Sequence, residues 1–227
     1  MESLLNRQGR SAVIRLVDPV AESNCYVICG EKSCLVIDPN NFEMLEELFK
    51  AQKLCPAMVI LTHGHCDHIS GLNELRKHYA MPVIATKGCS EEMQNMKLNM
   101  SRMMEMFLYY KSGEKKLVPY SPFTCDAADI EFEDETTVTF EETDIWLKAL
   151  PGHTHGSCVI YCEEILYCGD YLLPDDKVVT RLPGGSDEEY EAYARPWLKT
   201  VGDGTIICPG HGVPYVMSRE MRNRHDL

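Results

Sequence analysis

The segment Thr-His-Gly-His-Cys-Asp-His at positions 62–68 constrains this chain more than any other feature. It places three histidines and one aspartate within six consecutive residues, directly after the apolar run 58–61. Such a run predicts a buried β-strand. Imidazole nitrogen and carboxylate oxygen are the ligands that a catalytic zinc-type ion prefers, and several of them must converge on it. The segment therefore predicts a strand that ends at a metal site.

Three later segments repeat this pattern of an apolar run that ends in a glycine-containing loop. The loops present His153, Asp170 and His211. Glycine lets the backbone turn sharply and approach a ligand closely. We expect the four strand ends to gather these side chains at one edge of a sheet sandwich; for His155, in the same loop as His153, a plain turn is the alternative. The remaining two histidines are predicted to face solvent: His78 and His225.

Apolar periodicity predicts an alternation of strands and helices on both sides of these loops. Strands are expected over 12–17, 24–29, 33–38, 57–61, 82–85, 136–140, 144–150, 158–162, 165–168 and 205–208. Helices are expected over 42–53, 70–79, 90–111 and 188–200. Two successive β-rich halves indicate an α/β fold in which two sheets pack face to face with helices outside, a four-layer αββα sandwich. Because the chain has 227 residues and shows no linker, we expect one domain spanning residues 1–227.

Charge and hydropathy restrict the partners of the chain. A net charge of −13 argues against nucleic acid, because phosphate binding requires clustered lysine and arginine. A small anionic substrate remains compatible, since a bound metal can dominate the local field. The chain contains no run of about eighteen apolar residues, so we expect no transmembrane helix. The N-terminus shows no apolar signal segment, so we expect a cytoplasmic protein that acts on a small molecule, with no membrane partner. The sequence does not define the oligomeric state.

The chain contains eleven cysteines, and in a reducing compartment we expect them to be small buried apolar residues. The pairs Cys25/Cys29 and Cys158/Cys162 have a spacing that puts both sulfurs on one face of a strand. Core packing is the favoured interpretation of this spacing, with a structural zinc site as the alternative. Cys66 lies inside the first motif. Its simpler interpretation is a small residue that fills space, and the alternative is a thiol whose pKa is lowered by neighbouring cations.

The region 90–111 is rich in methionine. We expect a helix packed over the domain; the alternative is a flexible apolar wall beside a substrate pocket, because thioethers adapt to irregular shapes. Asn99 and Ser101 in this region are interpreted as residues that pin the helix to the metal edge.

Four motifs in a fixed order resemble those of the metallo-β-lactamase superfamily. They are His-x-His-x-Asp-His at 63–68, Pro-Gly-His-Thr-x-Gly-Ser at 151–157, Gly-Asp at 169–170 and Pro-Gly-His-Gly at 209–212. Within that superfamily, the chain is most similar to glyoxalase II-like small metallo-hydrolases. The resemblance implies two divalent metal ions, with Zn²⁺ expected first and Fe or Mn as alternatives. It also implies the αββα sandwich.

The resemblance assigns metal ligands to residues that match the motifs. The ligands implied for the first metal are His63, His65 and His153. Those implied for the second metal are Asp67, His68 and His211. The resemblance also implies that Asp170 bridges the two metals. Two ions about 3.5–4 Å apart share a hydroxide whose pKa they lower toward neutrality. This hydroxide would attack the carbonyl of a small thioester or ester-like substrate, and the metals would stabilise the oxyanion.

Two aspartates and one tyrosine are therefore the candidate catalytic residues: Asp67, Asp170 and Tyr171. Threonine is frequent in the family where this chain has Tyr171. This tyrosine is expected to pack, with pocket lining or a hydrogen bond to the oxyanion as alternatives. Typical glyoxalase II enzymes have a C-terminal helical domain. We expect no counterpart of it here, because few residues follow His211, so specificity for glutathione is not implied.

Two enzymatic alternatives remain open. A lactonase needs the same machinery as a thioester hydrolase. A persulfide dioxygenase-type oxidoreductase needs a single iron, for which His63, His153 and Asp170 would suffice. A non-enzymatic sensor would instead have a coordinatively closed metal site. The number and identity of bound metals discriminate between the enzymes.

Overall fold

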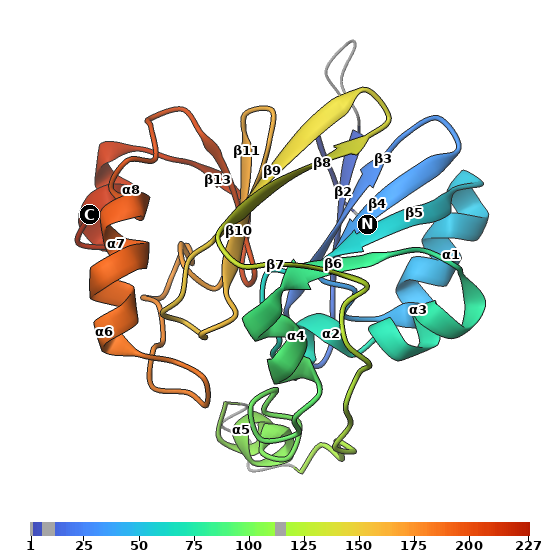
Figure 1. Cartoon of the computed structure of the whole chain (residues 1–227), viewed down its shortest axis with the longest axis horizontal. Helices are drawn as coiled ribbons and strands as arrows, with labels where there is room; N and C mark the ends of the chain where they lie inside the picture. The colour runs from blue at the N-terminus through green and yellow to red at the C-terminus, as the bar shows by residue number, and fades with distance from the viewer. Residues whose placement is uncertain (1, 6–11, 112–116) are drawn as a thin grey trace.

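Two mixed β-sheets pack face to face in the computed structural model, and helices cover both outer faces (Figure 1). The structure describes residues 2–5, 12–111 and 117–227. This arrangement confirms the predicted αββα sandwich.

The first sheet contains seven strands in chain order, β1 to β7. They are Glu2–Leu5 (β1), Ala12–Val17 (β2), Asn24–Cys29 (β3), Ser33–Ile37 (β4), Cys55–Ile60 (β5), Val83–Thr86 (β6) and Ile130–Phe132 (β7). The pairs from β1 to β4 are antiparallel, and β4 to β7 run parallel to one another. The carboxyl ends of β4, β5 and β6 therefore lie at one edge.

The second sheet has the strand order β13-β12-β11-β10-β9-β8. Its strands are Glu135–Phe140 (β8), Thr143–Ala149 (β9), Cys158–Cys162 (β10), Ile165–Gly169 (β11), Ile206–Pro209 (β12) and Tyr215–Val216 (β13). Only the β11–β12 pair is parallel among these described strands. Two further carboxyl ends consequently lie side by side.

Helices flank the sandwich on both sides (Figure 1). Those on the side of the first sheet are Phe42–Gln52 (α1), Cys66–Ile69 (α2), Leu72–His78 (α3) and Lys87–Met93 (α4). Those beside the second sheet are Asp187–Glu189 (α6), the π-helical turn Tyr190–Ala194 (η1), Arg195–Leu198 (α7) and Arg219–Arg224 (α8). The remaining helix, Met104–Lys111 (α5), lies beyond the sandwich, at the end where α2 and α4 are found (Figure 1).

Apolar side chains fill three layers between these elements. Strand β4 shows how the sequence builds them, because successive residues of a strand point to opposite faces. Val36 packs with Leu45 and Leu48 of α1, whereas its neighbours Leu35 and Ile37 belong to the layer between the two sheets. A third layer joins the second sheet to α7. Burial of apolar surface on both faces of each sheet thus fixes the sandwich.

The prediction of one long helix over 90–111 is wrong. Helix α4 ends at Met93 and α5 begins at Met104, with turns between them. The Oδ1 atom of Asn95 accepts hydrogen bonds from the backbone N–H groups of Lys97 (3.0 Å) and Leu98 (3.4 Å). Asparagine side chains that bind nearby backbone compete with helix formation. Met100 also has a φ of 62°, which a right-handed helix excludes.

Two further expectations need correction or completion. His225 is buried rather than solvent-facing, and its Nε2 lies 3.5 Å from the hydroxyl of Tyr215. The strands β1, β7 and β13 were not predicted.

The eleven cysteines are free, and no cysteine takes part in a metal-type cluster among the residues that the structure describes. None of the helices in the described ranges combines the length and apolar character that crossing a bilayer requires.

Candidate metal centre

The predicted ligands lie at strand ends on one edge of the sandwich. His63 and His65 lie in the loop after β5, Asp170 directly follows β11, and His211 lies two residues after β12. Carboxyl ends of parallel strands are a recurrent place for binding sites, because the loops there are free to carry functional side chains. His153 lies in the connection between β9 and β10. The chain therefore delivers ligands from both sheets.

Hydrogen bonds between the sheets hold these loops together. The N–H of Cys158 at the start of β10 donates to the carbonyl of Thr62 after β5, at 2.7 Å. The N–H of Asn24 in β3 donates to the carbonyl of Gly210 after β12, also at 2.7 Å. Each bond joins a strand of one sheet to a ligand loop of the other. The register of the two sheets consequently sets the position of the cluster.

One group of three ligand atoms comes from His63, His65 and His153, and these atoms lie within 4.8 Å of one another. The Nδ1 of His65 faces the Nε2 of His153 at 3.1 Å. Burial lowers the pKa of all three imidazoles, and that of His65 to about 3. They are therefore neutral near pH 7 and offer lone pairs, as metal ligation requires.

A second group comes from Asp67, His68 and His211, again with ligand atoms within 4.8 Å. Asp67 and His68 stand in the first turn of α2, which begins directly after His65. The Oδ2 of Asp67 lies 3.2 Å from the Nε2 of His211 and 3.8 Å from that of His68. Burial alone would raise the pKa of Asp67, but the neighbouring His68 and His211 hold it below its usual value.

The carboxylate of Asp170 lies between the two groups. Its oxygens are 3.6 Å from the Nε2 of His153 in the first group, and 3.4 and 3.7 Å from those of His68 and His211 in the second. Burial would raise its pKa, yet the surrounding histidines hold the pKa well below the usual range. An ionised carboxylate shared by two ligand sets has the placement of a bridging ligand.

Backbone carbonyls orient two of the histidines. The Nδ1–H of His153 donates to the carbonyl of Val179 at 2.7 Å, and that of His211 donates to the carbonyl of Glu22 at 3.2 Å. A carbonyl can only accept, so each ring carries its proton on Nδ1 and directs the Nε2 lone pair into the cluster. Such outer contacts fix the tautomer and direction of metal-binding histidines.

Asp38, which sequence reasoning missed, orients one histidine of each group. The Thr62 hydroxyl donates to Asp38 Oδ2 at 2.6 Å and accepts from the Nδ1–H of His63 at 3.1 Å. The Nδ1–H of His68 donates to the same carboxylate oxygen at 3.0 Å. A signal for this residue existed, because Asp38 follows the apolar strand β4 as the candidate ligands follow theirs.

The donor set fits divalent metal ions. The Nε2 of His63 is buried and has no hydrogen-bond partner among the described residues, while its Nδ1 is engaged by Thr62. An unpaired buried nitrogen costs free energy unless a ligand occupies its lone pair. Together with five other nitrogen and carboxylate donors in the two groups and Asp170 between them, it favours zinc-type or iron-type ions.

Glu92 is a second residue that sequence reasoning missed, and no motif marks it. Its buried carboxylate accepts from the N–H of Gly156 at 2.8 Å and from the hydroxyl of Thr154 at 3.0 Å. Its Cβ also packs so closely on the first motif that a Cβ added at Gly64 would lie 2.7 Å away. Burial raises the pKa of Glu92 to about 7. Glu92 thus ties the loop of His153 to the first motif.

Tyr171 is buried, and its hydroxyl faces the backbone rather than the cluster. The hydroxyl donates to the carbonyl of Leu150 and accepts from the N–H of His153 at 3.3 Å. His155 lies outside the cluster, exposed and 2.9 Å from Glu189. Burial raises the pKa of the Cys66 thiol to about 12, which favours its interpretation as a filler residue.

The interpretation of Asn99 and Ser101 as pinning residues agrees with their contacts. Asn99 donates through Nδ2 to the carbonyl of Phe123 at 2.8 Å, and Ser101 donates to the same carbonyl at 3.0 Å. The N–H of Cys66 in turn donates to the carbonyl of Asn99 at 2.7 Å. The segment between α4 and α5 is thereby fixed to the start of α2, which carries two candidate ligands.

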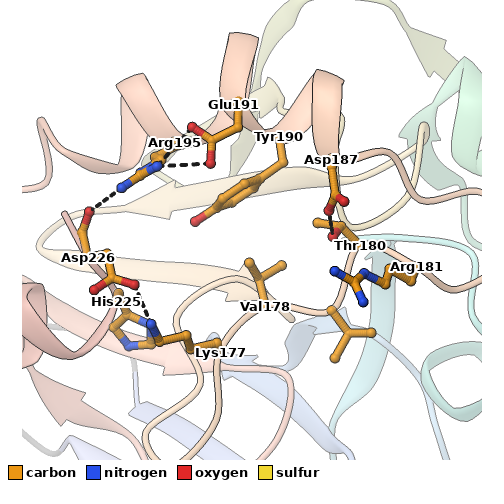
Figure 2. Close-up of a pocket in the computed structure, with 11 residues that line it drawn as sticks. Lys177, Val178, Thr180, Arg181, Asp187, Tyr190, Glu191, Arg195, His225 and Asp226 are labelled. Atoms are coloured by element: carbon orange, nitrogen blue, oxygen red, sulfur yellow. Dashed lines mark hydrogen bonds and ion pairs between the residues drawn. The ribbon is translucent and has the colours of Figure 1, made fainter.

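A cavity of about 400 Å³ opens over the cluster, with His65, Asp67, His153, Asp170 and His211 among its lining residues. A second cavity, of about 390 Å³, shares Lys177 and Val179 with the first. Figure 2 shows two ion pairs at this second cavity, Lys177 with Asp226 and Arg195 with Glu191. Of these two cavities in the described part of the chain, the first is the one lined by residues of the cluster, and it is therefore the candidate substrate site.

Comparison with known proteins agrees with this arrangement. The family model described as the metallo-beta-lactamase superfamily matches residues 18–211. A probable metallo-hydrolase of Bacillus subtilis, YqgX, is 26% identical over 86% of this chain and 87% of its own length. A hydroxyacylglutathione hydrolase of Wigglesworthia glossinidia brevipalpis is 26% identical over 80% of this chain, and the match spans only 58% of that enzyme.

Solved structures show the same fold. The BLEG-1 B3 metallo-beta-lactamase superposes with a TM-score of 0.76 at 24% identity, covering 94% of this chain and 97% of the other. ETHE1 from Myxococcus xanthus gives a TM-score of 0.68 at 22% identity, with coverages of 94% and 82%. At these identities the likeness concerns the fold alone.

Proposed function

Because this chain belongs to the metallo-beta-lactamase superfamily, we propose that it is a dinuclear metal-dependent hydrolase of a small thioester or ester-like substrate. The observation that carries the proposal is the position of Asp170, whose carboxylate lies within 3.4–3.7 Å of histidine nitrogens from both ligand groups. A mononuclear site would not need an anion shared in this way.

The residues divide the work according to their positions. One metal would be held by His63, His65 and His153. The second would be held by Asp67, His68 and His211. When bound, the pair of metals supplies an activated water and a positive field for the carbonyl oxygen. Outer contacts orient the ligands, and the half-buried His211 lines the cavity through which a substrate would approach.

Tyr171 is proposed as a positioning residue for the loop of His153 rather than as a donor to the substrate. Its single hydroxyl proton is engaged by the carbonyl of Leu150. A donor to a developing oxyanion would have to lie within hydrogen-bond distance of the reacting carbonyl. The catalytic groups of the proposal are therefore the carboxylates of Asp67 and Asp170, acting as metal ligands.

An oxidoreductase that uses one iron is the competing function, since three of the clustered side chains would suffice for it: His63, His153 and Asp170. The two functions differ in stoichiometry and in the consumption of oxygen. A lactonase differs from the proposed enzyme only in the carbonyl compound that it accepts. The cytoplasmic location also remains a proposal, which cell fractionation would test.

Removal and restoration of metal test the proposal. We expect the purified protein to hydrolyse a thioester, to lose activity in a chelator, and to regain it with Zn²⁺, Fe²⁺ or Mn²⁺. Thioesters and lactones should be screened together, and oxygen uptake with a persulfide serves as the counter-assay. Hydrolysis that survives complete metal removal, or oxygen uptake in place of hydrolysis, would contradict the proposed function.

A further inference from the structure

The cavity over the ligand cluster has two chemically different sides. Its base carries the candidate metal ligands, and its wall is built from apolar side chains, of which Met100, Met104 and Phe107 come from α5 and the turn before it. Leu173 and Leu182 extend the wall from the segment that follows Asp170. The alternative interpretation of the methionine-rich region, an apolar wall beside a substrate pocket, therefore applies to Met100 and Met104.

Helix α5 presents one face to this cavity. Met104, Phe107 and Lys111 are spaced i, i+3 and i+7, which places them on one side of a helix, and all three line the cavity. Met106 and Tyr110 do not line it and are 62% and 75% exposed. Phe107 remains 43% exposed although it is a large apolar side chain. Its face toward the cavity thus offers apolar surface to a ligand.

The two lysines at this cavity already have anionic partners. The Nζ of Lys111 lies 3.1 Å from a carboxylate oxygen of Glu22 and donates to the carbonyl of Ala21 at 3.1 Å. Lys177 pairs with Asp226 in the neighbouring cavity (Figure 2). An anionic group on the substrate would have to compete with these carboxylates. The wall therefore favours an uncharged, apolar group.

Resting on the proposed function, we propose that the acyl half of the substrate is an uncharged apolar chain of several carbons, held against Met100, Met104 and Phe107. The volume of about 400 Å³ lies in the range typical of small-molecule sites. Unbranched thioether side chains adapt to a chain of variable length better than branched ones do. The carbonyl of such a substrate would lie at the ligand cluster and its chain along α5.

A chain-length series on one leaving group tests this inference. Acetyl, butyryl, hexanoyl and octanoyl thioesters of N-acetylcysteamine are compared on the metal-loaded protein, with the succinyl thioester as a charged counterpart of butyryl. We expect kcat/KM to rise by about fourfold for each methylene that becomes buried, until the cavity is filled. The succinyl thioester should be cleaved more slowly than the butyryl one.

Variants of α5 locate the effect in the wall. In Met104→Gln and in Phe107→Gln the gain per methylene should fall to about twofold or less, because the added chain meets a polar side chain. Phe107 is partly exposed, so its variant tests the wall even if Met104→Gln fails to fold. Met106→Gln, a change on the opposite face of the same helix, should keep the fourfold gain.

The outcomes separate the two proposals. If the acetyl and succinyl thioesters are hydrolysed as fast as the octanoyl one, the acyl pocket is wrong and the hydrolase stands. The acyl pocket is also wrong if the gain per methylene is the same in Phe107→Gln as in the unchanged protein. If the metal-loaded protein cleaves none of the esters or lactones, both proposals are wrong.

Discussion

Behind the five clustered histidines lie residues that bind the outward-facing nitrogen of four of the rings, those of His63, His68, His153 and His211. Asp38 accepts from His68 directly and from His63 through the hydroxyl of Thr62, so that one carboxylate orients a ligand of each group. Glu92 performs a different task, because it binds the backbone and hydroxyl of the loop that follows His153. Neither residue belongs to the ligand sets proposed for the metals.

Asp38→Asn should weaken metal binding by about 10–100-fold, the usual effect of losing an outer contact of a metal-binding histidine. The amide has one acceptor oxygen, and its nitrogen cannot accept the proton of Thr62 or His68. Competition against a chromophoric chelator measures the affinity. Asp126→Asn, a change at an exposed aspartate, is the matched control. Equal affinities in the Asp38 variant and the control would show that Asp38 does not orient the ligands.

Glu92→Gln should change how stability depends on pH. Burial raises the pKa of Glu92 to about 7 in the folded chain, above the value that it has when unfolded. The folded state then binds this proton more tightly, so the free energy of unfolding falls as pH rises from the ordinary carboxyl range to about 7. The glutamine variant lacks this contribution.

Urea denaturation in the presence of a chelator, at about pH 5 and about pH 7.5, measures the effect of Glu92. The difference between the two pH values should be smaller in Glu92→Gln than in the unchanged protein. Glu91→Gln, at the exposed neighbouring position, should retain the full difference. An identical pH dependence in both variants would contradict a raised pKa for Glu92.

At the scale of elements, the site depends on how closely helix α4 approaches the loop after His153. The backbone of Gly156 lies against that of α4, since a Cβ at this position would be 2.1 Å from the nitrogen of Cys89 and 2.5 Å from its Cα. The hydroxyl of Thr86, at the N-terminus of α4, donates to the carbonyl of Gly156 at 2.5 Å. Contact between the two backbones leaves no space for a side chain.

Gly156→Ala should therefore destabilise the fold by about 1–3 kcal/mol, the usual cost of overpacking a well-packed site. The atoms in the way belong to the backbone of α4 and cannot turn aside as a flexible side chain would. Thermal unfolding of the metal-free protein measures the change. Gly202→Ala is the control, because no atom lies within 4 Å of a Cβ at that position. Similar melting temperatures for the two variants would refute the close approach.

At the scale of the whole molecule, the sequence predicted the layered fold and the positions of the candidate ligands, because both depend on local patterns. Each ligand segment follows an apolar run that forms a strand. The ends of β5, β11 and β12 lie at edges that parallel neighbours share, and His153 follows the antiparallel strand β9. Asp38 obeys the same rule and could have been predicted. Glu92 could not, since its partner Thr154 is 62 residues away and no motif marks the contact.

The break between α4 and α5 was not predicted, because the periodicity of the methionines does not reveal it. Methionine periodicity alone favours a continuous helix, whereas the side chain of Asn95 and the left-handed backbone of Met100 end it. The break allows α5 to lie over the ligand cluster and to supply the wall of the cavity. Burial of His225 likewise depends on the packing of the C-terminal helix against the second sheet, which no local pattern encodes.

The metal content per chain, measured after reconstitution of the unchanged protein and of Asp170→Ala, tests the central claim most directly. We expect about two metal ions per chain in the unchanged protein. In Asp170→Ala we expect the loss of most bound metal together with almost all hydrolysis, because the carboxylate common to both ligand groups is gone. An alanine variant that retained both ions and full activity would contradict a shared dinuclear centre.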